Sequence, residues 1–276
     1  MDWIKDGIVD FVVTAYKELF IGLDSVMEMA KLSPSQFNPT LWDSVTGFNK
    51  NAVLPIAWSV LTLFLLLELV AYFRRSNTKG LEGIYWIALI FLKIMIAKLL
   101  IDNMSVIIDA IFAICTQIIQ NGQDWTITNK QIDFGAIADS LDGKNVLTLL
   151  GVFIETLIIS FASHTCFLLA KVIVQLRFIE IYVFMAIAAL PFATLPSEEY
   201  SVIGKNFLKR LIALGLHAIF IIIVIYMYSV LMNATVFNVD ANNVTGAMWE
   251  IVGYAILVVI ALFQTGGWAK SICQAN

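Results

Sequence analysis

Four ionisable side chains stand inside long apolar stretches of this sequence, where a charge is costly. They are Glu68, Lys93, Lys98 and Glu155. An ionisable group at the centre of a transmembrane helix costs roughly 3 kcal/mol on insertion scales, so in proteins it faces other protein groups or water. Such residues pair with each other, relay protons or line an ion or substrate path. These four residues are therefore the first candidates for function.

Two of these charged residues are predicted to lie at the same depth in the membrane. Lys93 and Glu155 each lie nine residues from the start of an apolar run, which at about 1.5 Å per helical residue is about 13.5 Å deep, near the centre of a bilayer. Three interpretations stay open: a Lys93–Glu155 ion pair between helices, a polar lining of a water-filled lumen formed by several subunits, or side chains that snorkel along lipid. Lys98 can snorkel more easily, because it lies closer to the end of its run.

A second charged group lies between two apolar runs, in the stretch "LPSEEYSVIGKNFLKRL" at 195–211. Its charged residues are Glu198, Glu199, Lys205, Lys209 and Arg210. Basic residues at such a position set the topology of a membrane protein, and they are also able to meet phosphate or an acidic patch on a partner. The two glutamates beside them would weaken a phosphate site. If this segment, an elbow between the two runs, binds anything, we expect it to dock a partner protein rather than a ligand rich in phosphate.

The sequence offers little for catalysis. Ser160 and His164 are four residues apart on one predicted helix, but no nucleophile elbow and no third member accompany them. The sequence has no HExxH motif and no phosphate-binding glycine loop. His164 and His217 are predicted to pack against other helices, because two isolated histidines do not make a metal site. We therefore predict no enzymatic activity, no cofactor and no metal.

The composition predicts an all-α polytopic integral membrane protein. Of 276 residues, 60% are hydrophobic and 14% are charged, against about 45–50% and about 25% in soluble domains. Crossing about 30 Å of hydrocarbon takes about 20 helical residues. Five predicted transmembrane helices meet this requirement with their flanks, at 52–73, 84–101, 146–170, 211–232 and 251–265.

Two further segments are predicted to be helices that do not cross the membrane. Residues 1–23 are amphipathic, with apolar residues at three-to-four-residue spacing, and this helix lies at the membrane interface or packs on the protein's own spans. Residues 178–195 form a re-entrant or oblique helix that ends near Pro191 and Pro196. Proline fits such an end because it lacks an amide proton and disfavours helix in the residue before it.

Charge sorting predicts the orientation, because short cytoplasmic loops are rich in Lys and Arg. With the N-terminus outside and the C-terminus inside, the outer segments hold six basic residues against fourteen acidic ones, a net charge of −8. The inner segments hold nine basic residues against four acidic ones, a net charge of +5. A full crossing by 178–195 would put Lys205, Lys209 and Arg210 outside and break the rule.

The predicted organisation has five parts. Residues 1–51 are an extracellular-side amphipathic helix and linker, 52–101 a transmembrane hairpin, and 102–145 an extracellular-side segment. Residues 146–210 hold a transmembrane helix, the oblique helix and the cytoplasmic elbow. Residues 211–276 are a second transmembrane hairpin with a cytoplasmic C-terminus.

Three separated stretches of the chain resemble one known family. They are "LWDSVTGFNKNAVLPIAWSVLTLFLLLELV", "PFATLPSEEYSVIGKNFLKRLIALGLHAIFIIIVIYMYSVL" and "ALFQTGGWAKSICQAN", in this order. The stretches are similar to TrbL-like polytopic proteins of conjugative elements in Gram-positive bacteria, which are relatives of the VirB-type inner-membrane channel subunit. About five spans, an outside N-terminus and an inside C-terminus are what this resemblance implies for the fold.

The resemblance also implies a function and partners. The function is that of a membrane channel or scaffold subunit of a conjugative type IV secretion system, in the cytoplasmic membrane. The implied partners are other membrane subunits of the system, its cytoplasmic motor ATPases, further copies of this chain and, transiently, a relaxase with attached single-stranded DNA. The residues alone leave a second class open, a secondary transporter or a small-solute or ion channel.

Overall fold

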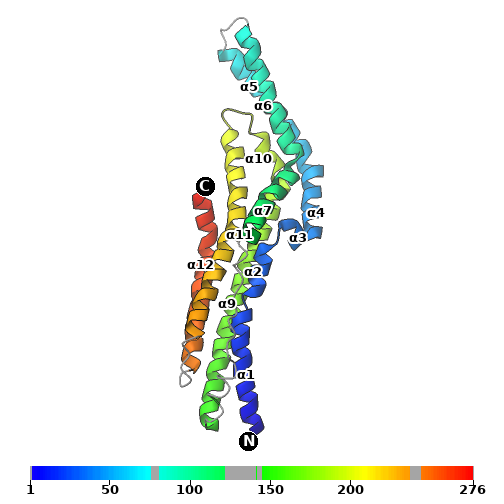
Figure 1. Cartoon of the computed structure of the whole chain (residues 1–276). Coiled ribbons are helices and arrows are strands. Elements are labelled where there is room, and N and C mark those ends of the chain that lie inside the picture. Colours follow the sequence, from blue (N-terminus) through cyan, green and yellow to red (C-terminus); the bar gives the residue numbers. More distant parts are fainter. Residues whose placement is uncertain (1, 76–80, 122–140, 142–144, 237–243, 276) are drawn as a thin grey trace. The chain divides into compact units, whose positions relative to one another are not determined.

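The computed structural model describes residues 2–75, 81–121, 141, 145–236 and 244–275, and within these ranges every regular element is a helix (Figure 1). The elements are α1 (Asp2–Ile21), α2 (Asp24–Lys31), α3 (Pro34–Phe37), α4 (Pro39–Phe48), a π-helical turn η1 (Asn49–Val53), α5 (Leu54–Arg75), α6 (Leu81–Asp102), α7 (Met104–Asn121), α9 (Val146–Ile187), α10 (Ala189–Ala193), α11 (Ser201–Val236) and α12 (Val244–Ile272).

Six helical stretches of the described chain are long and apolar enough to cross a membrane. They are Pro39–Arg74, Ile84–Asp102, Met104–Asn121, Val146–Ile187, Ser201–Leu231 and Met248–Ile272. The prediction of an all-α polytopic membrane protein is thus confirmed, and all five predicted spans fall in helices. The orientation stays a prediction.

The sixth candidate span is α7, which the sequence analysis placed in the outer segment 102–145. Its 18 residues carry one charged side chain, Asp109, and the many acidic residues after it hid this apolar run. A single residue, Asn103, separates α6 from α7. Two antiparallel crossings need a longer connection, so α7 continues the path of α6 rather than returning beside it.

Helix α9 differs from the expected pattern. It runs unbroken over 42 residues and joins the predicted span 146–170 to the start of the predicted oblique helix 178–195. Neither glycine nor proline occurs between residues 152 and 187, so nothing in this stretch interrupts helical hydrogen bonding. At about 1.5 Å per residue, α9 is about 63 Å long, roughly twice the hydrocarbon thickness of about 30 Å. Part of α9 therefore lies outside the hydrocarbon.

A compact turn follows α9 at the prolines, as predicted. Helix α10 ends two residues after Pro191. The Thr194 hydroxyl donates to the Pro191 carbonyl at 2.8 Å and accepts from the Gly204 N–H at 3.2 Å. A side chain on Gly204 would lie 2.7 Å from that same Pro191 carbonyl oxygen. The close approach of α10 and α11 in this elbow therefore depends on glycine.

The described chain divides into two compact units. Unit 1 comprises Met1–Lys31, Ile119–Leu176 and Ala218–Thr265, and unit 2 comprises Leu32–Ile118, Arg177–His217 and Gly266–Asn276. The core of unit 1 includes fully buried residues of α1, α9, α11 and α12: Val12, Ile159, Ile221, Ile251 and Leu262. The core of unit 2 includes fully buried residues of α5, α7, α9 and α11: Ala57, Ile108, Phe178, Ile181 and Leu211.

In unit 2 the segment from α3 to η1 wraps the last turns of α9. The Tyr182 hydroxyl donates to the Pro34 carbonyl at 2.8 Å, and the rings of Phe37 and Phe178 stack with centroids 4.1 Å apart. The buried Asn49 amide donates to the carbonyls of Met185 and Ala186, both at 3.0 Å. The last carbonyls of a helix have no partner within the helix, so Asn49 stabilises the end of α9.

Helices α5 and α6 form an antiparallel hairpin in unit 2 (Figure 1). At one end of the hairpin, the indole N–H of Trp58 donates to the Asp102 carboxylate at 3.2 Å. Helix α10 packs against both helices of the hairpin. The elbow that follows α10 is thereby brought to the charged residues of α5 and α6.

Candidate functional site

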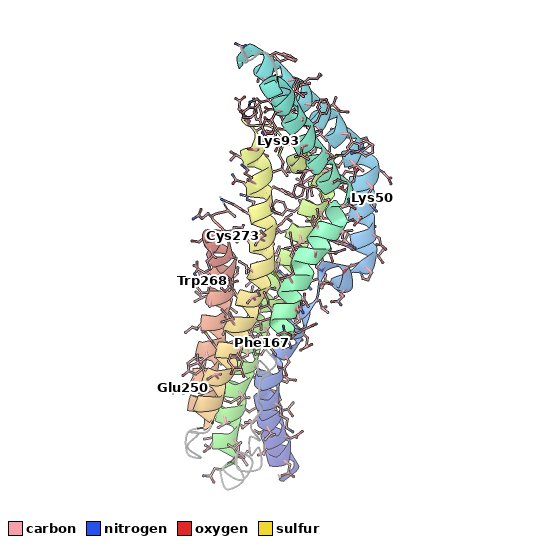
Figure 2. The ribbon with its side chains drawn as sticks, turned by 45° about the horizontal axis from the view of Figure 1, so that its top comes forward. Lys50, Lys93, Phe167, Glu250, Trp268 and Cys273 are labelled. Carbon is pink, nitrogen blue, oxygen red and sulfur yellow. The ribbon has the colours of Figure 1, made fainter. Side chains whose placement is uncertain are left out.

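The elbow of unit 2 meets two of the four predicted intramembrane charges. The backbone N–H of Glu198 donates to Glu68 Oε1 on α5 at 2.6 Å. On α6, Lys93 Nζ lies 3.8 Å from Glu198 Oε1, and Figure 2 labels Lys93 on this helix. Two groups that the sequence analysis treated separately, the intramembrane charges and the elbow, therefore share one site.

A cavity of about 540 Å³ opens at this place. Its lining residues come from α5 and from the elbow: Leu67, Glu68, Val70, Ala71, Arg74, Ser197, Glu198, Glu199 and Tyr200. The Tyr200 ring packs on Phe64 of α5, with ring centroids 5.4 Å apart. The cavity thus has an apolar wall and a charged rim with three carboxylates and one guanidinium.

The charged residues of this site are better suited to recognising a partner than to stabilising the fold. Lys93 and Glu198 are each about half exposed, at 48% and 54%, and exposed ion pairs contribute roughly 0–1 kcal/mol. The hydrogen bond from Glu198 to the Glu68 carboxylate is charge-assisted and stronger. We therefore expect Glu68 to orient the elbow, while Glu199 at the rim stays open to a partner.

The three basic elbow residues lie on α11 and do not line the cavity. Lys205 is exposed and Lys209 is half-buried. Burial raises the pKa of the Cys273 thiol, just beyond α12, and the nearby positive charge of Lys209 partly offsets the rise. Arg210 is half-buried, and its Nε has no hydrogen-bond partner. Glu198 and Glu199 line the cavity, whereas the basic residues form a separate surface.

The remaining predicted residues lie elsewhere. Glu155 belongs to unit 1, is half-buried, and accepts a hydrogen bond of 2.8 Å from the Trp249 indole of α12. Lys98 is exposed on α6. Because Lys93 and Glu155 belong to different units, the Lys93–Glu155 pair stays a prediction.

Unit 1 contains a polar site that sequence reasoning missed. His164 Nδ1 donates to the Ser160 carbonyl at 2.8 Å, and His164 Nε2 lies 3.5 Å from Glu18 Oε2 on α1. The imidazole is 61% exposed, so the expectation that this histidine simply packs against other helices does not describe it. A cavity of about 450 Å³ lies beside the pair, lined by Glu18, Gly22, Ser25, His164, Phe167, Leu168 and Lys171. Glu18 and His164 are far apart in the sequence, so no local pattern predicts this contact.

A buried arginine in unit 2 is the second feature that was missed. Arg177 is 3% exposed and counted in the sequence analysis only as an inner-side charge. Its Nε donates to the Leu214 carbonyl of α11 at 3.0 Å. Its guanidinium carbon lies 5.1 Å and 6.0 Å from the ring centroids of Phe178 and Phe112, within the range of cation–π attraction. Arg177 therefore ties α7, α9 and α11 together.

Charged and aromatic side chains line both of the cavities described above. In the part of the chain that the structure describes, no three His, Cys, Asp or Glu side chains are placed to hold a metal ion. Six membrane-capable helices, with charged residues gathered at an elbow, define the class as a polytopic helical membrane protein.

The chain matches the family described as TrbL/VirB6 plasmid conjugal transfer like protein over residues 22–189. This is more than half of the chain, which therefore belongs to the TrbL/VirB6 family and is a component of conjugal transfer, in type IV secretion. The matched range includes the stretch 41–70 on which the resemblance partly rested, and it ends before the elbow. No curated protein and no solved structure matches the chain.

Proposed function

We propose that this protein is a channel or scaffold subunit of a conjugative type IV secretion system in the cytoplasmic membrane. It helps to carry a relaxase with its attached single-stranded DNA across that membrane. The observation that carries the proposal is the family match over residues 22–189 in a chain with six membrane-capable helices. No ATP-binding motif occurs in the sequence, so the energy comes from the motor ATPases of the system.

The elbow is the proposed docking surface for those partners. It is fixed to the α5–α6 hairpin by the Glu68–Glu198 hydrogen bond, and it offers a cavity with carboxylates beside a separate basic surface on α11. Surfaces with both signs of charge suit selective protein contacts, since complementary charges steer the right partner and repel wrong ones. Phosphate binding would favour a purely basic surface. The proposed occupant is therefore a protein of the secretion system.

A conducting path would require several copies of the chain. One protomer, whose described residues include six membrane-capable helices, is too small to enclose a pore for a DNA strand, so the proposal includes a homo-oligomer together with other membrane subunits. Substitutions of Lys93 and Glu155 distinguish a channel from a scaffold, because these residues are predicted to line the lumen of a channel. A scaffold predicts that Lys93→Ala with Glu155→Ala preserves transfer, whereas a lining role predicts that single and double changes all impair it.

Transfer from donor cells tests the docking role of the elbow. The test variant is Lys205→Gln, Lys209→Gln and Arg210→Gln, and the control is Lys50→Gln, which removes an exposed lysine away from the elbow. We expect the elbow variant to lower transfer frequency at least tenfold at normal membrane abundance, with the control unchanged. Equal transfer by both variants would contradict docking through this basic surface.

A further inference from the structure

In unit 1, helix α1 lies lengthwise beside the first part of α9 (Figure 1). The rings of Phe11 and Phe153 pack with centroids 5.0 Å apart. Farther along both helices Glu18 meets His164, and Gly22 lies against Phe167, which is labelled in Figure 2. The residue numbers rise together on the two helices. Helix α1 is therefore parallel to α9 and covers its residues from about 153 to 167.

The same part of α9 carries an exposed apolar stripe. Every seventh residue, from Leu147 through Ile154 and Phe161 to Leu168, is exposed, at 84%, 58%, 77% and 61%. Twenty-one residues of helix extend about 31 Å, which matches the hydrocarbon thickness of about 30 Å. Exposed apolar residues continue along α9 as far as Ile187, so the stripe is assigned to lipid by its exposure and by its place within the predicted span 146–170.

The side of α1 that faces away from the core of unit 1 carries charged residues at the same level as this stripe. Ile8, Val12 and Ala15 are buried in unit 1, whereas Asp6 and Asp10, on the other face of the helix, are exposed. Because Phe11 packs on Phe153, Asp10 lies level with about residue 152, which is about 7.5 Å inside the Leu147 end of the lipid-facing stripe. A carboxylate at that level is strongly unfavourable in hydrocarbon, so this face of α1 needs a polar environment.

We infer that the face of α1 that carries Asp6, Asp10 and Thr14 borders a water-filled lumen, while the Leu147–Leu168 stripe of α9 meets lipid. Water fits this face better than a packed protein interface does, because the cores of protein interfaces are depleted of charged residues. Helix α1 is then a lumen-facing helix within the membrane and not a surface anchor.

The inference deepens the proposed function, because a lumen at this position requires several assembled copies of a channel subunit. Thiol accessibility tests it in membranes from cells that are not transferring DNA. The background is Cys115→Ala with Cys166→Ala and Cys273→Ala, and it must support transfer at the wild-type frequency. Loss of transfer on deletion then tests the proposed function, and accessibility tests the lumen, so the two can fail separately.

Four single-cysteine variants complete the experiment: Asp10→Cys and Thr14→Cys on the charged face, Phe161→Cys on the stripe, and Val12→Cys in the core. A negatively charged, membrane-impermeant methanethiosulfonate is applied to both sides of the membrane, and lipid-soluble N-ethylmaleimide is applied in parallel. We expect the charged reagent to modify Asp10→Cys and Thr14→Cys at least tenfold faster than Phe161→Cys. Val12→Cys reacts slowly with both reagents.

Two results would overturn the inference. If Phe161→Cys reacts with the charged reagent as fast as the α1 variants, this part of α9 lies in water and not in lipid. If Asp10→Cys and Thr14→Cys react no faster than Val12→Cys, another protein surface covers α1 and no lumen lies there. Use of two positions on α1 guards against a local effect of either substitution.

Discussion

The elbow of unit 2 and the Asp6–Asp10 face of α1 in unit 1 place their charged residues in opposite ways. In the elbow of unit 2, charges from distant segments meet one another: Glu68 accepts from the Glu198 backbone, and Lys93 lies beside the Glu198 carboxylate. On α1 of unit 1, Asp6 and Asp10 point away from the buried face. Charges that meet within the chain fix its local structure, whereas charges that point outward report what surrounds the chain. Substitutions of charges that meet within the chain are therefore expected to lower its stability. Substitutions of outward-facing charges are expected to alter its contact with the surroundings instead.

The largest effect is expected at the elbow glycine. In Gly204→Ala the added methyl group would lie 2.7 Å from the Pro191 carbonyl oxygen and 2.7 Å from the Leu195 side chain. Such overpacking costs about 1–3 kcal/mol or more, and it should lower both the unfolding temperature in detergent and the amount of protein in the membrane.

The matched control is Gly253→Ala on α12, where nothing lies within 4 Å of the added methyl group. Alanine favours a helix over glycine by up to about 1 kcal/mol, so this variant should be as stable as wild type or more stable. Equal unfolding temperatures for the two variants would show that the elbow is not as tightly packed as described.

The next effect concerns the end of α9. Asn49→Ala removes two hydrogen bonds to the carbonyls of Met185 and Ala186, and leaving buried polar groups unsatisfied costs about 1–3 kcal/mol. Asn103→Ala is the control, because Asn103 is exposed and its side-chain amide donates to the nearby Leu99 carbonyl of α6, four residues away in the sequence. Thermal unfolding followed by circular dichroism should place Asn49→Ala clearly below wild type and Asn103→Ala within about 0.5 kcal/mol of it.

Two substitutions of Glu68 distinguish the contribution of its hydrogen bond from that of its charge. Glu68→Gln keeps an oxygen that accepts from the Glu198 N–H, whereas Glu68→Ala removes the acceptor. We expect Glu68→Ala to cost about 1–2 kcal/mol of unfolding free energy and Glu68→Gln less than half of that. If the two variants are equally unstable, the carboxylate charge and not its hydrogen bond orients the elbow.

The smallest effect is expected for the exposed ion pair. Lys93→Gln removes a contact of 3.8 Å between half-exposed groups, and its loss should change the unfolding free energy by less than about 1 kcal/mol. Lys98→Gln, on the same helix, serves as the reference. A loss of transfer in Lys93→Gln at unchanged stability would show that Lys93 serves the function of the protein and not only its local structure.

Local apolar patterns predicted most of the helices, and long-range contacts accounted for what was missed. The runs around α5, α6, α9, α11 and α12 are long and apolar enough to read directly from the sequence. The join between 146–170 and 178–187 was missed because a span of about 20 residues was taken to end at 170, whereas α9 continues unbroken to Ile187. Helix α7 was missed because acidic neighbours outweighed its own apolar run.

The candidate site was predicted only as separate pieces. Glu68, Lys93 and Glu198 were each singled out for their chemistry, but 130 residues separate the partners of the Glu68–Glu198 hydrogen bond. No local rule joins such residues, and the same holds for Glu18 with His164. Arg177 was overlooked as a core residue because arginine is rarely fully buried.

Transfer frequency from a donor that lacks this protein tests its role in conjugal transfer most directly. We predict that deletion abolishes conjugal transfer and that wild-type protein, expressed in trans at normal membrane abundance, restores it. Transfer at the wild-type frequency from the deletion strain would contradict the role in conjugal transfer that family membership and the six membrane-capable helices support.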